Sequence, residues 1–202
     1  FMCLFSQQTA LRSVENLKFE AQTIESDKSF IYGLMFSGCT NLLYAPKILP
    51  AQNLLGGYCY GSMFEDCTSL ITAPKLPATT VSRSAYQYMF QRCTSLVNAP
   101  KLPATTLDSQ CYQYMFQGCT SLTSAPELPA KELIRNCYQL MFKDCSKLRY
   151  VKALFTTSPS EETTKDWLSG VAASGTFVKS KNATWNVTGV HSIPKGWKIE
   201  TQ

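Results

Sequence analysis

The stretch YQYMFQGCTSLTSAPELP, residues 112–129, is the clearest copy of a unit that makes up most of the chain. Its Met-Phe pair recurs at spacings of 28, 26, 26 and 26 residues, beginning with Met35 and Phe36. In every copy a Tyr stands three residues before the Met, a Cys four residues after it and a Leu seven residues after it. A worn copy with Leu4, Phe5 and Leu11 opens the chain. A fixed period of this length predicts stacked structural repeats.

Each copy divides into two segments with different patterns. Tyr, Met, Phe and Cys fall at i, i+3, i+4 and i+7, which predicts one face of an α-helix of about two turns. The residues that suit its caps are Ser29, Ser84, Ser109 and Asn136 at the start and Gly38 and Gly118 at the end. The next segment, Leu-x-x-Ala-Pro-x-Leu-Pro, predicts a very short strand, because proline has no N–H for a strand ladder.

We therefore expect an α/β fold, a right-handed leucine-rich-repeat solenoid with a short parallel strand and a short helix in each repeat. Stacking buries the Tyr, Met, Phe and Leu columns, so these columns have a structural explanation and need no functional one. Residues 1–155 are expected to form the solenoid, with about six repeats of which the first is degenerate. Residues 156–202 are expected to form a C-terminal α+β cap, with a helix from Ser158 that buries Trp167, Leu168 and Val171, and strands near 176–178 and 197–199.

The frame M-F-x-x-C-x-S-L-x-x-A-P-x-L-P resembles the repeats of BspA-like bacterial surface proteins and the related 26-residue bacterial surface repeat. The resemblance covers about residues 4–155. The segments at 167–171, 175–177 and 193–197 are similar to the tail that often closes such arrays. The resemblance implies an exported protein, extracellular or at the bacterial cell surface, and several such proteins act in adhesion. This chain departs from the common pattern in its Ala-Pro-x-Leu segment.

Nine cysteines raise the questions of disulfides and of metal. Cys39, Cys67, Cys93, Cys119 and Cys145 form one column, and Cys59, Cys111 and Cys137 form a second, with Cys3 outside both. Equivalent residues on adjacent coils are about 4.8 Å apart with parallel Cβ vectors, whereas a disulfide needs side chains that face each other. Free, buried thiols are therefore favoured, with a cross-column disulfide as the alternative. Zinc is disfavoured, because there is no Cys-x-x-Cys and His191 is the only histidine.

Composition and motifs point away from several function classes. The net charge is +5 with scattered Lys and Arg, and no apolar run approaches the roughly 20 residues of a membrane helix, so we expect neither a nucleic-acid partner nor a membrane-spanning segment. The first residues lack the features of an intact signal peptide, and we expect a processed protein or a piece of a longer one. No phosphate loop, nucleophile elbow or His-Glu-x-x-His occurs, so we expect no enzyme, no cofactor and no metal.

The candidate binding residues are those that vary between copies in the strand segment. Two residues after the repeated Leu stand Tyr44, Thr72, Asn98, Ser124 and Tyr150. Two residues after the Ala position stand Lys47, Lys75, Lys101 and Glu127. In leucine-rich-repeat geometry both columns line the concave face or its rim, and their polar and aromatic mixture suits contact with a protein or a glycan.

Two functions follow from this pattern. The first is a binding or adhesion module that recognises a protein or glycan of a host or a neighbouring cell through its strand face. The alternative is a structural spacer within a larger surface protein, with no ligand of its own; the same columns would then be a solvated surface.

Overall fold

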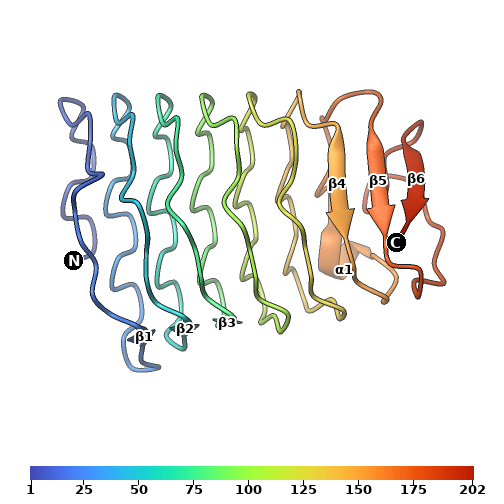
Figure 1. Ribbon diagram of the computed structural model, residues 1–202, viewed down its shortest axis with the longest axis horizontal. Coiled ribbons are helices and arrows are strands. Elements are labelled where there is room, and N and C mark those ends of the chain that lie inside the picture. Colours follow the sequence, from blue (N-terminus) through green and yellow to red (C-terminus); the bar gives the residue numbers. More distant parts are fainter.

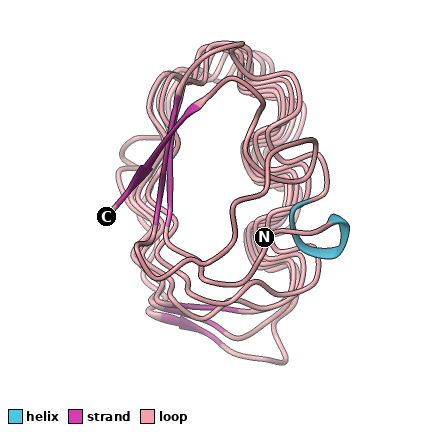
Figure 2. Cartoon of the chain, turned by 90° about the vertical axis from the view of Figure 1, so that its right-hand side faces the viewer, coloured by secondary structure: helices cyan, strands magenta, loops and turns pink.

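The computed structural model describes all residues, 1–202, and shows an elongated solenoid of about seven turns. The coils stack side by side along the long axis, with the two termini at opposite ends (Figure 1). Seen along the stack, the coils outline a narrow oval, with the longer strands on one long side and the shortest strands at one end of the oval (Figure 2). The predicted solenoid is confirmed.

The regular elements are few and short. One parallel sheet has the order β1-β2-β3, and a second has the order β4-β5-β6. In register, Thr23 pairs with Asn53 and Asn53 with Thr80, while Tyr150 pairs with Thr176 and Thr176 with Lys198. The bounds are β1 Thr23–Ile24, β2 Asn53–Leu54, β3 Thr80–Val81, β4 Tyr150–Ala153, α1 Glu161–Thr164, β5 Thr176–Lys179 and β6 Lys198–Thr201.

The predicted helix in each repeat is wrong. Residues 32–39, 60–67, 86–93, 112–119 and 138–145 form consecutive β-turns instead, and we call the side that they build the turn face. In one coil the Met115 N–H donates to the Tyr112 carbonyl at 3.2 Å, whereas the Tyr114 N–H donates to Gln139 of the next coil at 3.0 Å. The N–H groups thus alternate along the chain: one closes a local turn, and the next donates to the adjacent coil. The i to i−4 ladder of an α-helix therefore never forms.

The backbone of the turn face explains the misplaced caps. One residue in four has a positive φ, including 55° at Ser62 and 60° at Tyr114, at the third position of a type II turn. Ser84 and Asn136 share this conformation, so they are not helix caps. Gly38, with φ 73°, is a turn residue of the same ladder and not a helix end. The same applies to Gly118.

The repeated apolar columns form one continuous core, as predicted. A single cluster of 53 buried residues runs from Ile24 to Trp197. Aromatic rings of equal position stack from coil to coil, with centroids 5.4 Å apart for Phe36 and Phe64 and 5.9 Å apart for Tyr60 and Tyr86. The same four inward positions would also satisfy a helix, which is why burial was predicted correctly although the backbone was not.

Proline sets the length of the strands. In the copies that carry Ala-Pro, the strand segment makes only isolated bridges, such as Ser124 to Tyr150. In the last copy Lys152 replaces the residue equivalent to Pro126, and there the four-residue strand β4 forms. The missing proline N–H therefore limits the other copies to single bridges, in agreement with the expectation.

The tail adds a further coil to the stack. The Phe142 N–H donates to the Trp167 carbonyl at 2.9 Å, which places Trp167 in the position that Met holds in the repeats. Trp167 and Leu168 are buried, as predicted. They are not helical, however, because α1 begins after Ser160 and ends at Thr164. The two expected strands are present as β5 and β6.

The thiols are all free, and eight of the nine are buried. The Cys67 Sγ lies 3.1 Å from the Phe36 carbonyl of the preceding coil, and Cys93 and Cys119 repeat this contact at 3.1 Å. Every buried thiol except that of Cys111 donates to a backbone carbonyl, and all eight fill the space of a small apolar side chain. Burial raises the pKa of Cys59 to about 11 and that of Cys145 to about 12.

We expect Ellman's reagent at pH 8 to modify only Cys3 in the folded protein, because Cys3 alone is exposed and the other thiols are buried and protonated. All nine cysteines should react in 6 M guanidinium chloride. The absorbance of the released thiolate counts both. Prompt modification of several thiols in the folded state would contradict the continuous core.

Candidate ligand-binding face

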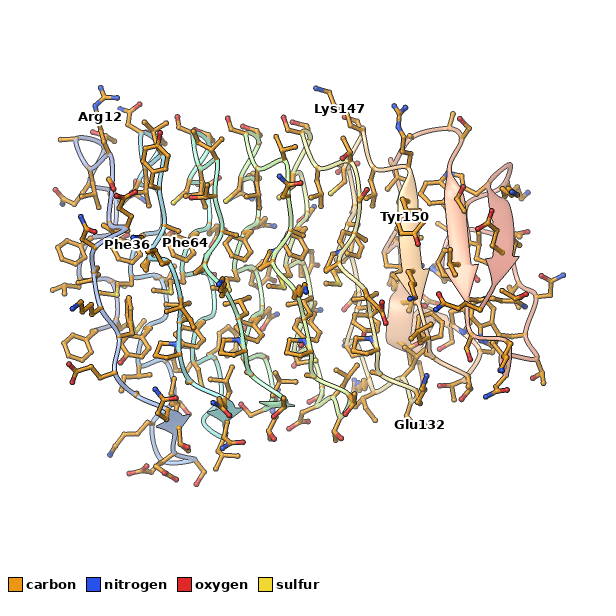
Figure 3. The ribbon with its side chains drawn as sticks, in the orientation of Figure 1. Arg12, Phe36, Phe64, Glu132, Lys147 and Tyr150 are labelled. Atoms are coloured by element: carbon orange, nitrogen blue, oxygen red, sulfur yellow. The ribbon has the colours of Figure 1, made fainter.

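The first candidate column lies on one exposed surface, which we call the strand face. Parallel bridges join Tyr44 to Thr72, Asn98 to Ser124 and Ser124 to Tyr150. All five side chains are exposed, and Tyr150 lies in β4 on the side facing the reader in Figure 3. The structure therefore brings this column together across successive coils, with bridges between all neighbouring members except Thr72 and Asn98.

Buried or half-buried residues before and after each member of this column keep its side chain at the surface. In the copy around Ser124, Leu122 is fully buried before it and Ala125 is buried after it. The Ala125 N–H donates to the Tyr150 carbonyl of the next coil at 2.9 Å. The backbone is thus fixed on both sides of Ser124, and the exposed side chain projects from a rigid ladder.

The second column runs beside the first on the strand face. Lys47, Lys75, Lys101 and Glu127 are all exposed. The Lys75 N–H donates to the Lys47 carbonyl at 3.0 Å, so these positions are also in register. Glu127 forms an ion pair with Lys152 at 2.9 Å. None of the three lysines forms an ion pair, so the column presents unneutralised positive charge.

Shallow hollows follow the lysine column. The largest, of about 510 Å³, lies between the second and third lysines and is walled by Pro74, Pro77, Pro100 and Pro103. A neighbouring hollow of about 380 Å³ continues it past Lys101 to Glu127 and Pro129. Proline rings give rigid apolar walls, and the lysine ammonium groups give charge at the rim. Such a surface accepts an extended ligand with apolar and acidic groups.

An apolar stripe borders the first column, and the sequence reasoning missed it. Ile71 is 41% exposed and Val97 is 43% exposed, and the Ile71 N–H donates to the carbonyl of half-buried Leu43 at 3.0 Å. These residues share the position directly after the repeated Leu, so the repeat alignment could have found them. Large apolar groups exposed in a row are typical of interaction surfaces.

The histidine and the cysteines are residue types that often serve in catalysis, but here their surroundings are those of structural residues. The Asp166 N–H donates to His191 Nδ1 at 3.2 Å, which ties the single histidine to the backbone of the tail. A nucleophilic cysteine needs a lowered pKa, whereas burial raises the pKa of the thiols of both columns. No helix of the chain is both long enough and apolar enough to cross a bilayer.

Comparison with known proteins gives no relative for this chain: no family model, no curated protein and no solved structure matches it.

Proposed function

We propose that this chain is an extracellular or cell-surface binding module that recognises a protein or glycan of a host or neighbouring cell through its strand face. The observation that supports this proposal is the exposed ladder of varied side chains, from Tyr44 to Tyr150, held in register on a rigid backbone. The apolar stripe beside the ladder and the proline-walled hollows add contact area of the kind that binding surfaces use.

The resemblance of the repeats to BspA-like surface proteins supports the proposed location. It rests on the Met-Phe, Cys and Leu columns, which the structure places in the core. We assign the chain to this leucine-rich-repeat group as part of the proposal, with turns in place of the helix of each repeat.

The geometry also favours a particular shape of ligand. Successive coils present equivalent side chains at intervals of about 4.8 Å, so an extended chain that crosses the coils meets a repeated set of contacts. Lys75 and Lys101 line one hollow and have no acidic partner. Acidic ligands should therefore bind more tightly than neutral ligands of the same shape.

The alternative function is a spacer that holds another domain away from the cell surface. The observation that favours it is the uninterrupted core, since 53 residues pack in one cluster along the whole stack. Such a rod would hold an attached domain away from the cell surface without binding a ligand.

The deciding measurement is binding of the purified chain to an array of extracellular-matrix proteins and of neutral and acidic glycans. Changing Tyr44, Asn98, Ser124 and Tyr150 to Ala should weaken a saturable interaction at least tenfold, because a few central residues carry most of the energy of an interface. A matched control changes four exposed residues outside the strand face to Ala, namely Lys28, Glu132, Asn182 and Thr184.

The outcomes separate the two functions. The control variant should bind as the unchanged protein does, and a double Lys75→Gln, Lys101→Gln variant should lose affinity for acidic ligands only. Binding that survives in a folded strand-face variant would move the site elsewhere. No binding to any member of the array would favour the spacer.

A further inference from the structure

A third hollow lies away from the strand face, where β3 leads into the turn face. Its volume is about 260 Å³, and its lining is entirely polar: Arg83, Ser109, Gln110, Arg135 and Asn136. Its five residues come from three successive copies of the repeat. Neither candidate column contributes to it, so its properties do not depend on the proposed ligand of the strand face.

The repeat places two arginines on either side of a serine. Arg83, Ser109 and Arg135 stand six residues before the Met of their own copies, so they occupy one column on adjacent coils. The Ser84 N–H donates to the Ser109 carbonyl at 3.0 Å, and the Gln110 N–H donates to the Arg135 carbonyl at 3.1 Å. The two arginine backbones are therefore about 10 Å apart, and both side chains can reach the space above Ser109.

A glutamine positions the first arginine. The Arg83 Nε donates to Gln110 Oε1 at 3.3 Å, and Gln110 Nε2 donates to Gln113 Oε1 at 3.2 Å. Gln113 in turn donates to Gln139 in the next coil, a partly buried contact between two side-chain amides. Arg83 is thus directed across its neighbouring coil, and its terminal NH₂ groups have no acceptor in the protein.

The hollow has no acidic partner for this charge. Asp108 is next to it in sequence, but the Asp108 carboxylate accepts the Ser109 N–H at 2.6 Å and forms no ion pair. Arg92, on the turn face, is different: its guanidinium lies 3.1 Å from Glu65 and also binds Asp66. The chain therefore neutralises one arginine of this side and leaves two like charges together in a hollow.

We propose that this hollow binds an oxyanion, a carboxylate, sulfate or phosphate group, between the guanidinium groups of Arg83 and Arg135. A guanidinium offers a planar pair of N–H donors that matches two oxygens of such a group. The side-chain amide of Asn136 makes no hydrogen bond within the protein and lies in the lining as a further donor. The volume suits a single acidic group or one acidic sugar, and the site is separate from the strand face.

The test follows the arginine Nε–H signals of the ¹⁵N-labelled protein during titration with sodium sulfate, phosphate or acetate. Sodium chloride keeps the ionic strength constant, so general screening does not change. We expect saturable shifts of the Arg83 and Arg135 signals in the millimolar range for at least one anion, and the three titrations distinguish which group is preferred. The Arg92 signal, from an arginine already paired with acids, should not move in parallel.

Variants make the assignment specific. Arg83→Gln and Arg135→Gln should each weaken anion binding at least fivefold, whereas Arg149→Gln, at another exposed arginine, should leave it unchanged. Arg83→Lys should retain part of the binding, since it keeps the charge and loses the paired donors. Linear, non-saturating shifts in the unchanged protein, or full binding by both folded glutamine variants, would overturn the proposal.

Discussion

Replacing Phe64 with alanine is expected to lower the free energy of unfolding by about 3–5 kcal/mol. Phe64 is fully buried, and its ring stacks on Phe36 at 5.4 Å and on Phe90 at 5.6 Å. Figure 3 shows the Phe36 and Phe64 rings side by side in the interior. The substitution would leave a cavity where the ring stood. Backbone hydrogen bonds tie the flanking coils together on both sides of this cavity, so they cannot collapse into it.

Urea unfolding followed by circular dichroism measures this loss. The matched control is Phe30→Ala, because Phe30 is 42% exposed and stacks on Tyr58 alone. That control should cost less than about 1 kcal/mol. A Phe64→Ala loss as small as that of the control would show that the aromatic columns are not the main source of stability. Amide hydrogen exchange should also show faster opening of the coils next to residue 64, since each coil contacts only its neighbours.

Much of the core could be predicted from the sequence because solenoids repeat their environment. Once Met35, Met63 and Met89 are aligned, every residue at the same distance from them has the same surroundings, and one apolar column implies burial in all coils. The shortness of the strands followed from Pro46 and its equivalents. The strand β4 supports this reasoning, since it forms where Lys152 replaces proline.

The turn backbone could not be predicted in the same way. Apolar residues at i, i+3, i+4 and i+7 face inward in an α-helix, and they also face inward in a chain of turns with a period of four residues. The deciding quantity is the positive φ of residues such as Leu34, Tyr88 and Leu140, which are not glycine and carry no local sign of that conformation. The N–H groups of these residues donate to the next coil, and that tertiary pairing supports a backbone that isolated peptides avoid.

The strand-face columns could be predicted from the sequence, whereas the arginine hollow could not. Exposure of Tyr44, Asn98 and Lys75 followed from their place in the strand segment, which the structure has as expected. The arginine hollow was missed because it depends on which side chains of adjacent turn segments meet. In the helical interpretation Arg83 and Arg135 lie just before the expected caps Ser84 and Asn136, and nothing in that pattern brings them together.

Replacing Ser62 with proline is expected to remove about 3 kcal/mol or more of stability. Ser62 has φ 55°, which the proline ring forbids, and the Ser62 N–H donates to the Gln87 carbonyl of the next coil at 2.8 Å. Proline would therefore break a turn and a link between coils at one position. Urea unfolding with the Phe64 series as reference measures the effect.

Proline would also damage a helix, so the sign of a second substitution at Ser62 identifies the backbone. In a helix interior, Ser62→Gly should cost roughly 0.5 kcal/mol. At a positive φ it should instead stabilise by about 0.5–1 kcal/mol, because glycine adopts this conformation without the steric penalty that a side chain carries. The Ser62 side chain makes no hydrogen bond whose loss would mask the effect. If Ser62→Gly lowered the stability, this would contradict the turn ladder and favour the interpretation with a helix in each repeat.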